Sequence, residues 1–279
     1  MKLLTINIHS HDDSFDAELL NHHMKELAVF LHEESVDLIA LQEAAQEMDR
    51  PFAGSDLPMH CMIKDAAHTV RQGNAAYLLA NHLQELNEEY YWIWNGFKLG
   101  YRKYEEGLAI FSRKPITDTD CFWISGIRDF QHFKSRKALT AKIRTEQGEA
   151  LVCNVHMGRW DDPEESFKDQ MKRLQDALTE KTQIYLMGDF NSPAGIYDEG
   201  WEMLNQLGWL DTYALAEVRD EGITVPDAID GWRDGDHNGI RIDYIWLKQP
   251  ETVKTSCVVC NGVSGTVISD HYGVLAEIQ

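Results

Sequence analysis

Short apolar runs of strand length recur along the chain, and six of them have a polar residue at one edge. The run at residues 183–187 stops at Gly188-Asp189-Phe190-Asn191 and a proline, so a carboxylate and a carboxamide follow its last apolar residue closely. Apolar runs bounded by Gly, Asp, Asn and Pro predict strands that end in turns. Asn7, Glu43 and His156 also end apolar runs, and Asp243 and the pair Asp270 and His271 lie beside two more. So many strand ends with a hard ligand or a proton carrier indicate one shared site.

Segments with helical spacing of leucine and methionine lie between several of these strands. They predict helices over residues 20–33, up to about residue 89, and from residue 162 onward. The second helix is expected to start at a capping box formed by Thr69 and Gln72, and the third has Asp162 as its N-cap with Pro163 in the first turn. Helices and strands alternate in the first and third quarters of the chain, whereas strands cluster elsewhere. We therefore predict an α/β (α+β) fold of mixed sheets covered by helices. The length favours a single domain over residues 1–279.

Residues 90–104 are dense in aromatic side chains. Such a run can form a stacking platform for a base or a sugar ring. It more often fills the core from a strand and the adjoining loop, and we favour core packing here.

Acidic residues outnumber basic ones by 46 to 26, which gives a formal charge of -20. A field of this sign repels polyanions, so nucleic acid is disfavoured as a partner. The first apolar run is too short for a signal peptide, and acidic residues follow it too closely. No apolar stretch approaches the ~20 residues that span a bilayer. We therefore expect a cytoplasmic protein without membrane contact, and we infer no obligate protein partner.

Five cysteines form no even disulfide framework. Cys257 and Cys260 lie in a predicted strand that would point the two thiols to opposite faces. Free, reduced thiols are therefore favoured over a metal or redox role.

Four carboxylates at the predicted strand ends, those of Glu43, Asp189, Asp243 and Asp270, would repel one another unless a cation lay among them. Oxygen ligands without paired cysteines favour Mg²⁺, with Mn²⁺ as a substitute, over zinc. Such an ion polarises a phosphoryl oxygen while a carboxylate activates the attacking water. The sequence therefore predicts a metal-dependent phosphoesterase.

Roles for individual residues follow from this chemistry. We expect Glu43 to be the main metal ligand, Asp189 to be the base or water-positioning group, and Asn191 to be a neutral donor to the water or phosphoryl oxygen. His156 and His271 would donate to non-bridging oxygens or assist the leaving group. Taken singly, each residue also fits a purely structural role, as a turn former, a solvated acid or a half-buried histidine.

Two other motifs point elsewhere. His9-x-His11 after a first strand resembles the metal-binding start of amidohydrolase-like enzymes, but those need further histidine clusters at strand ends that here carry Glu, Asp and Asn. Residues 234–239 copy the opening of an EF-hand loop, yet Ile245 stands where the loop needs Glu. We interpret that segment as a loop on the substrate side.

The motifs together resemble the endonuclease/exonuclease/phosphatase superfamily of metal-dependent phosphoesterases. The resemblance spans nearly the whole chain in the family's order, through Asn7, Leu41-Gln42-Glu43, Gly107-Leu108-Ala109-Ile110-Phe111-Ser112, Asn154-Val155-His156, Gly188-Asp189-Phe190-Asn191, Arg241-Ile242-Asp243-Tyr244 and Ser269-Asp270-His271. It implies a four-layer sandwich of two face-to-face mixed β-sheets flanked by helices, with a Mg²⁺ site at one rim. It also implies that Asp243 orients His271, and that Asn7 and Asp270 join Glu43 in the metal site.

Longer runs resemble a bacterial subgroup that includes maltose 6'-phosphate phosphatases. They are residues 104–110, Arg136-Lys137, residues 156–160 and residues 229–232. By this resemblance the substrate is a small phosphorylated sugar, with Trp160 or Trp232 stacking on its ring and Arg136 or Arg159 binding its phosphate; core tryptophans and surface arginines are the competing interpretation. Alternatives are a metal-dependent nuclease, a sphingomyelinase-like phosphodiesterase and a non-catalytic binding protein on the same scaffold. The nuclease is disfavoured because Glu105 and Glu106 occupy the place of a tyrosine that family nucleases carry.

Overall fold

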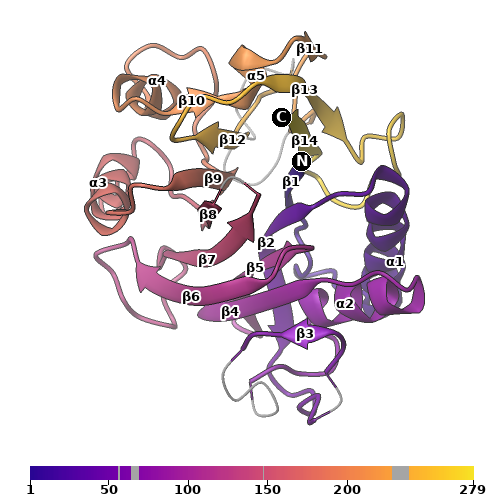
Figure 1. Ribbon diagram of the computed structural model, residues 1–279. Helices are drawn as coiled ribbons and strands as arrows, with labels where there is room; N and C mark the ends of the chain where they lie inside the picture. Colours follow the sequence, from indigo (N-terminus) through magenta and orange to yellow (C-terminus); the bar gives the residue numbers. More distant parts are fainter. Residues whose placement is uncertain (56, 64–68, 147, 228–238) are drawn as a thin grey trace.

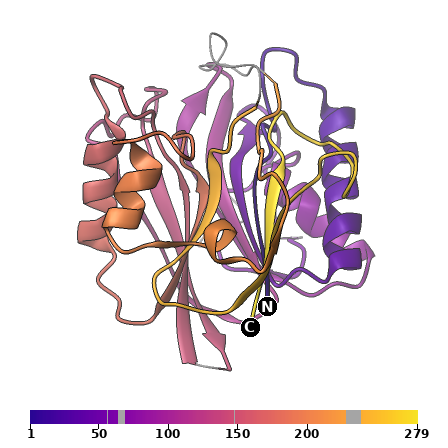
Figure 2. The same ribbon diagram turned by 90° about the horizontal axis from the view of Figure 1, so that it is seen from above.

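Two mixed β-sheets lie face to face with helices on their outer faces, as predicted (Figures 1 and 2). The computed structural model describes residues 1–55, 57–63, 69–146, 148–227 and 239–279. The larger sheet has the order β11-β13-β14-β1-β2-β5-β4-β3, and the smaller one has the order β10-β12-β9-β8-β7-β6. The strands are β1 (Lys2–Asn7), β2 (Leu38–Glu47), β3 (His60–Cys61), β4 (Tyr91–Gly100), β5 (Tyr104–Ser112), β6 (Ile116–Trp123), β7 (Lys137–Thr145), β8 (Gly148–His156), β9 (Gln183–Asp189), β10 (Leu210–Asp211), β11 (Val218–Arg219), β12 (Asp243–Leu247), β13 (Val253–Val259) and β14 (Gly273–Ile278).

The helices are α1 (Ala17–Glu34), α2 (Ala75–Glu85), α3 (Phe167–Ala177), α4 (Gly200–Gln206) and α5 (Thr212–Leu215). Alternation along the strands explains the layers. In β1, Leu4 and Ile6 face α1 and α2, whereas Leu3 faces the opposite sheet. A third apolar cluster joins the outer face of the smaller sheet to α3 and α4. Figure 2 shows α1 and α3 on opposite sides of the paired sheets.

The beginnings of two helices differ from the prediction. Helix α2 is capped by Asn74, whose side chain accepts from Tyr77 N, so the predicted capping box at Thr69 and Gln72 is wrong. Helix α3 is capped by Ser166 rather than Asp162. Asp162 instead accepts from the backbone N–H groups of the two glutamates that follow Pro163, which makes a separate turn before the helix. The observed caps differ from the predicted ones because several polar residues near each helix start are able to accept the bonds of the first turn. Tertiary packing selects among them.

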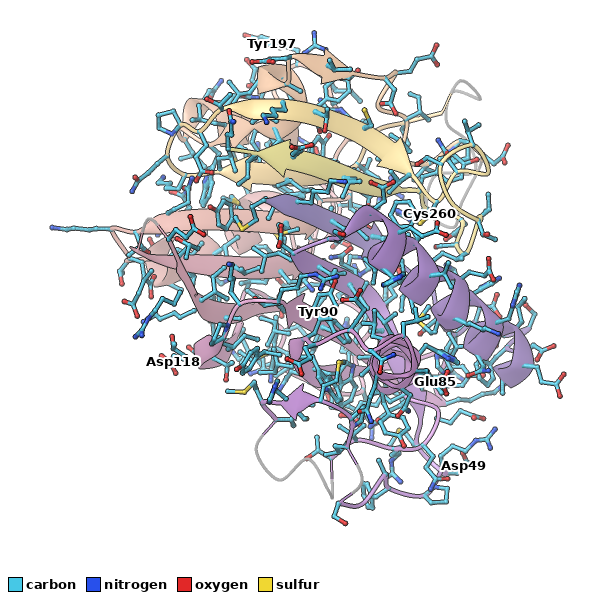
Figure 3. The ribbon with its side chains drawn as sticks, turned by 45° about the vertical axis from the view of Figure 1, so that its right-hand side comes forward. Asp49, Glu85, Tyr90, Asp118, Tyr197 and Cys260 are labelled. Carbon is cyan, nitrogen blue, oxygen red and sulfur yellow. The ribbon has the colours of Figure 1, made fainter. Side chains whose placement is uncertain are left out.

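Most of the aromatic segment fills the core, as we favoured, but Tyr101 is 39% exposed. Trp92 and Trp94 are fully buried on β4, and their indole N–H groups donate to Pro58 O and Ala44 O. Figure 3 shows Tyr90 within the molecule and Cys260 beside α1 at the end of β13. All five cysteines are free. None of the described helices is both long and apolar enough to cross a membrane.

Gly188 is the position in β9 where glycine is required. Its φ is +147°, and an added Cβ would overlap the carbonyl oxygen of Val155 on the neighbouring strand β8. We expect Gly188→Ala to lower the free energy of unfolding by about 3 kcal/mol or more, because neither backbone is free to move without breaking the ladder. Urea unfolding followed by circular dichroism measures this. An unchanged midpoint would show that the strand pair tolerates the methyl group.

Candidate active site

Strand register brings three predicted site residues to one edge of the smaller sheet. Asp189 pairs with His156 on β8 through the parallel register and with Asp243 on β12 through the antiparallel one. The three side chains therefore start from neighbouring Cα positions although they lie far apart in the sequence. All three residues are buried.

Glu43 reaches the same place from the larger sheet through a β-bulge. We predicted that its strand ends at Glu43, but β2 continues to Glu47, with a register shift between Leu41 and Ala44 in its pairing with β5. Glu43 has a φ of +51°, and Ser10 Oγ donates to its carbonyl oxygen at 2.7 Å. A bulge of this kind turns a side chain out of the strand's alternation, and so the Glu43 carboxylate points toward the cleft.

A buried polar contact fixes the spacing of the two sheets beneath the site. Gln42 Nε2 donates to Asn154 Oδ1 at 2.7 Å, and Asn154 Nδ2 donates to the carbonyl oxygens of Leu41 and Ala109. Gln42 precedes Glu43, and Asn154 lies two positions before His156, so this contact holds the strands that carry both site residues. We did not assign a role to either amide from the sequence, although two polar residues within apolar runs were a visible signal.

Asn7 holds the acids of the two sheets together. Its Nδ2 donates to Glu43 Oε1 at 2.9 Å and to Asp189 Oδ2 at 3.1 Å. Its Oδ1 accepts from the backbone N–H of His9 at 3.1 Å. In this orientation Asn7 acts as a shared donor between two carboxylates, and its predicted role as a metal ligand stays a prediction.

His156 and His271 lie on either side of Asp189. His156 Nε2 is 3.6 Å and His271 Nε2 is 4.0 Å from Asp189 Oδ2. Burial, with Arg136 and Lys98 nearby, holds the pKa of His156 well below its usual range, so this imidazole is neutral. Burial also opposes charge on His271, but Asp243, which accepts from its Nδ1 at 3.0 Å, raises the pKa of His271 to about 10.

The buried acids fit a divalent cation. Asp189, Asp243 and His271 each place one ligand atom within 4.8 Å of the others. Burial, followed by repulsion from Asp243, raises the pKa of Asp189 to about 7, and the buried Asp243 Oδ1 has no hydrogen-bond partner in the described part of the chain. A cation among these oxygens would relieve both the repulsion and the unmet acceptor. The cluster is thus consistent with a divalent metal site.

Asp270, predicted as a metal ligand, pairs with His9: His9 Nδ1 lies 3.1 Å from Asp270 Oδ2. This contact raises the pKa of His9 to about 9. Of the His9-x-His11 motif, only His9 lines the cleft. His11 is buried against Phe15, and burial lowers its pKa to about 3.

Asn191 adopts a left-handed backbone conformation, with a φ of +47°, directly after the β9 strand end. Its backbone N–H donates to Asp189 Oδ1 at 2.8 Å, and its Nδ2 donates to Met157 O at 3.0 Å. Its side chain also lines the cleft. The Gly-Asp-x-Asn turn therefore fixes the Asp189 carboxylate by a local bond.

Most of the titratable residues described above line one cleft of about 520 Å³: His9, Glu43, His156, Asp189, Asp270 and His271. Arg136 and Arg159, the predicted phosphate-binding residues, line it together with Lys98 and Phe133, which the sequence had not singled out. Tyr101, from the aromatic segment, lines it as well. Trp160 does not line this cleft. It packs against Phe167, with Lys168 over its ring, so its predicted sugar contact stays a prediction. Trp232 and most of the 234–239 loop lie outside the described residues.

Comparison with known proteins agrees with this architecture. Residues 4–271 match the model of the Endonuclease/Exonuclease/phosphatase family. A solved protein of that family from Leptotrichia buccalis is 29% identical with a TM-score of 0.86, covering 100% of this chain and 99% of that one. A mannosyl-6-phosphatase from Bacteroides thetaiotaomicron is 18% identical with a TM-score of 0.70, covering 100% and 99%. Truncated Caenorhabditis elegans TDP2 is 15% identical with a TM-score of 0.59, covering 99% and 96%.

A comparison with curated proteins found no match. The family model nevertheless covers nearly the whole chain, and six residues from the motifs of the sequence resemblance line one cleft: Glu43, His156, Asp189, Asn191, Asp270 and His271. This protein is therefore a member of the endonuclease/exonuclease/phosphatase family.

Proposed function

We propose that this phosphoric ester hydrolase is a Mg²⁺-dependent phosphomonoesterase whose substrate is a small phosphorylated sugar. The observation that carries the proposal is that Glu43, Asp189, His156 and His271 line one cleft of about 520 Å³. That volume is typical of small-molecule sites. The formal charge of -20 disfavours a nucleic-acid polyanion, and a mannosyl-6-phosphatase is among the proteins of the same fold.

In this proposal the chain's own residues divide the work. Glu43 and the buried aspartates would hold Mg²⁺, which supplies Lewis-acid polarisation of a phosphoryl oxygen when bound. Asp189 orients the attacking water and accepts its proton, because its carboxylate lies between the ends of the two sheets, within 4.0 Å of both imidazoles. The Asp243–His271 pair presents a charged imidazole to a non-bridging oxygen, and neutral His156 donates from the opposite side.

Purified protein tested with sugar phosphates, nucleotides, phosphoinositides and supercoiled plasmid will decide the substrate class. We expect release of inorganic phosphate from at least one sugar phosphate in Mg²⁺ or Mn²⁺, loss of turnover with excess chelator, and recovery when the metal is restored. Nicking of plasmid at low salt without phosphate release would favour the nuclease alternative. No turnover on any substrate would favour a binding protein on this scaffold. A cytoplasmic location and a single-domain organisation stay predictions.

A further inference from the structure

One wall of the cleft carries two cations that share a single carbonyl oxygen. Lys98 Nζ donates to Phe133 O at 3.4 Å, and Arg136 Nη1 donates to the same oxygen at 2.7 Å. The two positive groups are therefore held side by side. Both line the cleft that contains Asp189 and His156.

Lys98 is placed there by the strand pairing. A register shift between Gly96 and Lys98 in the β4–β5 pairing sets Lys98 directly opposite Glu106. Lys98 Nζ lies 2.8 Å from Glu106 Oε1, and Glu106 Oε1 lies 3.9 Å from His156 Nδ1. Contacts thus run without a break from Asp189 through His156 and Glu106 to the cation pair.

Arg136 differs from the other lysines and arginines of the cleft in having no carboxylate partner among the residues that the structure describes. Within the described part of the chain, Lys98 pairs with Glu106, Lys134 with Asp162 and Glu164, and Arg159 with Asp161. Among residues 1–55, 57–63, 69–146, 148–227 and 239–279, Arg136 bonds to the carbonyl oxygens of Phe133 and Ser135 alone, and its buried Nε finds no hydrogen-bond partner there. In a chain with a charge of -20, one uncompensated guanidinium with a free donor indicates that an anion supplies the missing partner.

We infer that Arg136, supported by Lys98, selects a phosphomonoester dianion over a phosphodiester monoanion. This deepens the proposed function and rests on it. A monoester carries close to two negative charges above its second pKa of about 6, and a terminal phosphate has three acceptor oxygens. A diester offers one charge and two free oxygens, so it loses the contact that the second charge makes with the cation pair.

The test compares two substrates with the same leaving group, 4-nitrophenyl phosphate and bis(4-nitrophenyl) phosphate, at pH 8 with Mg²⁺. We expect Arg136→Gln to lower the ratio of kcat/KM for the monoester to that for the diester by about tenfold or more, as for loss of one charge-assisted hydrogen bond. Arg136→Lys, which keeps the charge, lowers the ratio less. Lys98→Met with Glu106→Gln removes the buried ion pair as a unit and lowers the ratio as well.

Lys134→Gln is the matched control, because Lys134 lines the same cleft but already pairs with two carboxylates. Its ratio should match that of the parent. The inhibition constant of inorganic phosphate gives a second measure, and it should rise in Arg136→Gln and not in Lys134→Gln. A parent that releases phosphate from the monoester, combined with Arg136 variants of unchanged ratio, would overturn this inference and leave the proposed function standing. A parent that turns over neither 4-nitrophenyl phosphate nor any sugar phosphate would overturn both.

Discussion

Asp189→Asn should lower kcat for phosphate release by about 10²- to 10⁴-fold, the usual contribution of a positioned general base. Asp189 is the residue on which the site converges, since it contacts Asn7 directly and lies within 4.0 Å of both His156 and His271. The amide keeps the shape of the carboxylate but neither accepts the water's proton nor carries charge to a cation. Steady-state kinetics on the best substrate of the phosphate-release screen measure the change.

The stability of the same variant should move in the opposite direction. Burial and the neighbouring Asp243 both disfavour charge on Asp189, so the neutral amide removes a repulsive interaction from the metal-free protein. We expect a Tm equal to or above that of the parent in chelator. A large loss of kcat together with a lower Tm would mean that the substitution disturbs the folded structure, so the loss of kcat would not report on the general base. Turnover equal to that of the parent would remove Asp189 from the mechanism.

Glu43→Gln should weaken Mg²⁺ and Mn²⁺ binding by more than the roughly 10- to 100-fold that loss of an outer-shell partner costs. Glu43 supplies a carboxylate to the site from the larger sheet, and its side chain is partly accessible, whereas Asp189 and Asp243 are nearly or fully buried. Titration with Mn²⁺ followed by electron paramagnetic resonance measures binding without relying on activity. The metal concentration for half-maximal phosphate release should rise in parallel.

Glu47→Gln is the control for Glu43. Glu47 ends the same strand, and its carboxylate pairs with Arg50 at the surface instead of facing the cleft. Its Mn²⁺ affinity should equal that of the parent. If Glu43→Gln binds Mn²⁺ as tightly as the parent does, the metal lies elsewhere in the protein.

The sequence was informative wherever the signal was local. Apolar runs stopped by Asp189, His156 and Asn7 placed these residues at strand ends, and the structure confirms that these three residues end β9, β8 and β1. The sandwich of mixed sheets was predicted from the family resemblance and is confirmed. Periodicity alone predicted mixed sheets covered by helices, but not that the two sheets lie face to face. It reports which face of an element is buried and not which element covers that face.

The remaining features depend on pairing between distant segments. The bulge that turns Glu43 into the cleft arises from the register of β2 against β5, and the sequence of β2 alone does not predict it. The cation pair likewise forms because the segment that carries Phe133 and Arg136 folds over Lys98. Lys98 and Glu106 looked like ordinary charged residues within strands, since their pairing becomes visible only once β4 and β5 are aligned.

The most direct test of the shared metal site is anomalous diffraction from crystals of the parent and of Glu43→Gln grown with Mn²⁺. The account predicts a peak in the parent within about 2.5 Å of a Glu43 carboxylate oxygen, between the ends of the two sheets. The peak should weaken or vanish in the variant. A strong peak away from Glu43 and Asp189, or one unchanged in Glu43→Gln, would contradict the claim that acids from both sheets hold one catalytic cation.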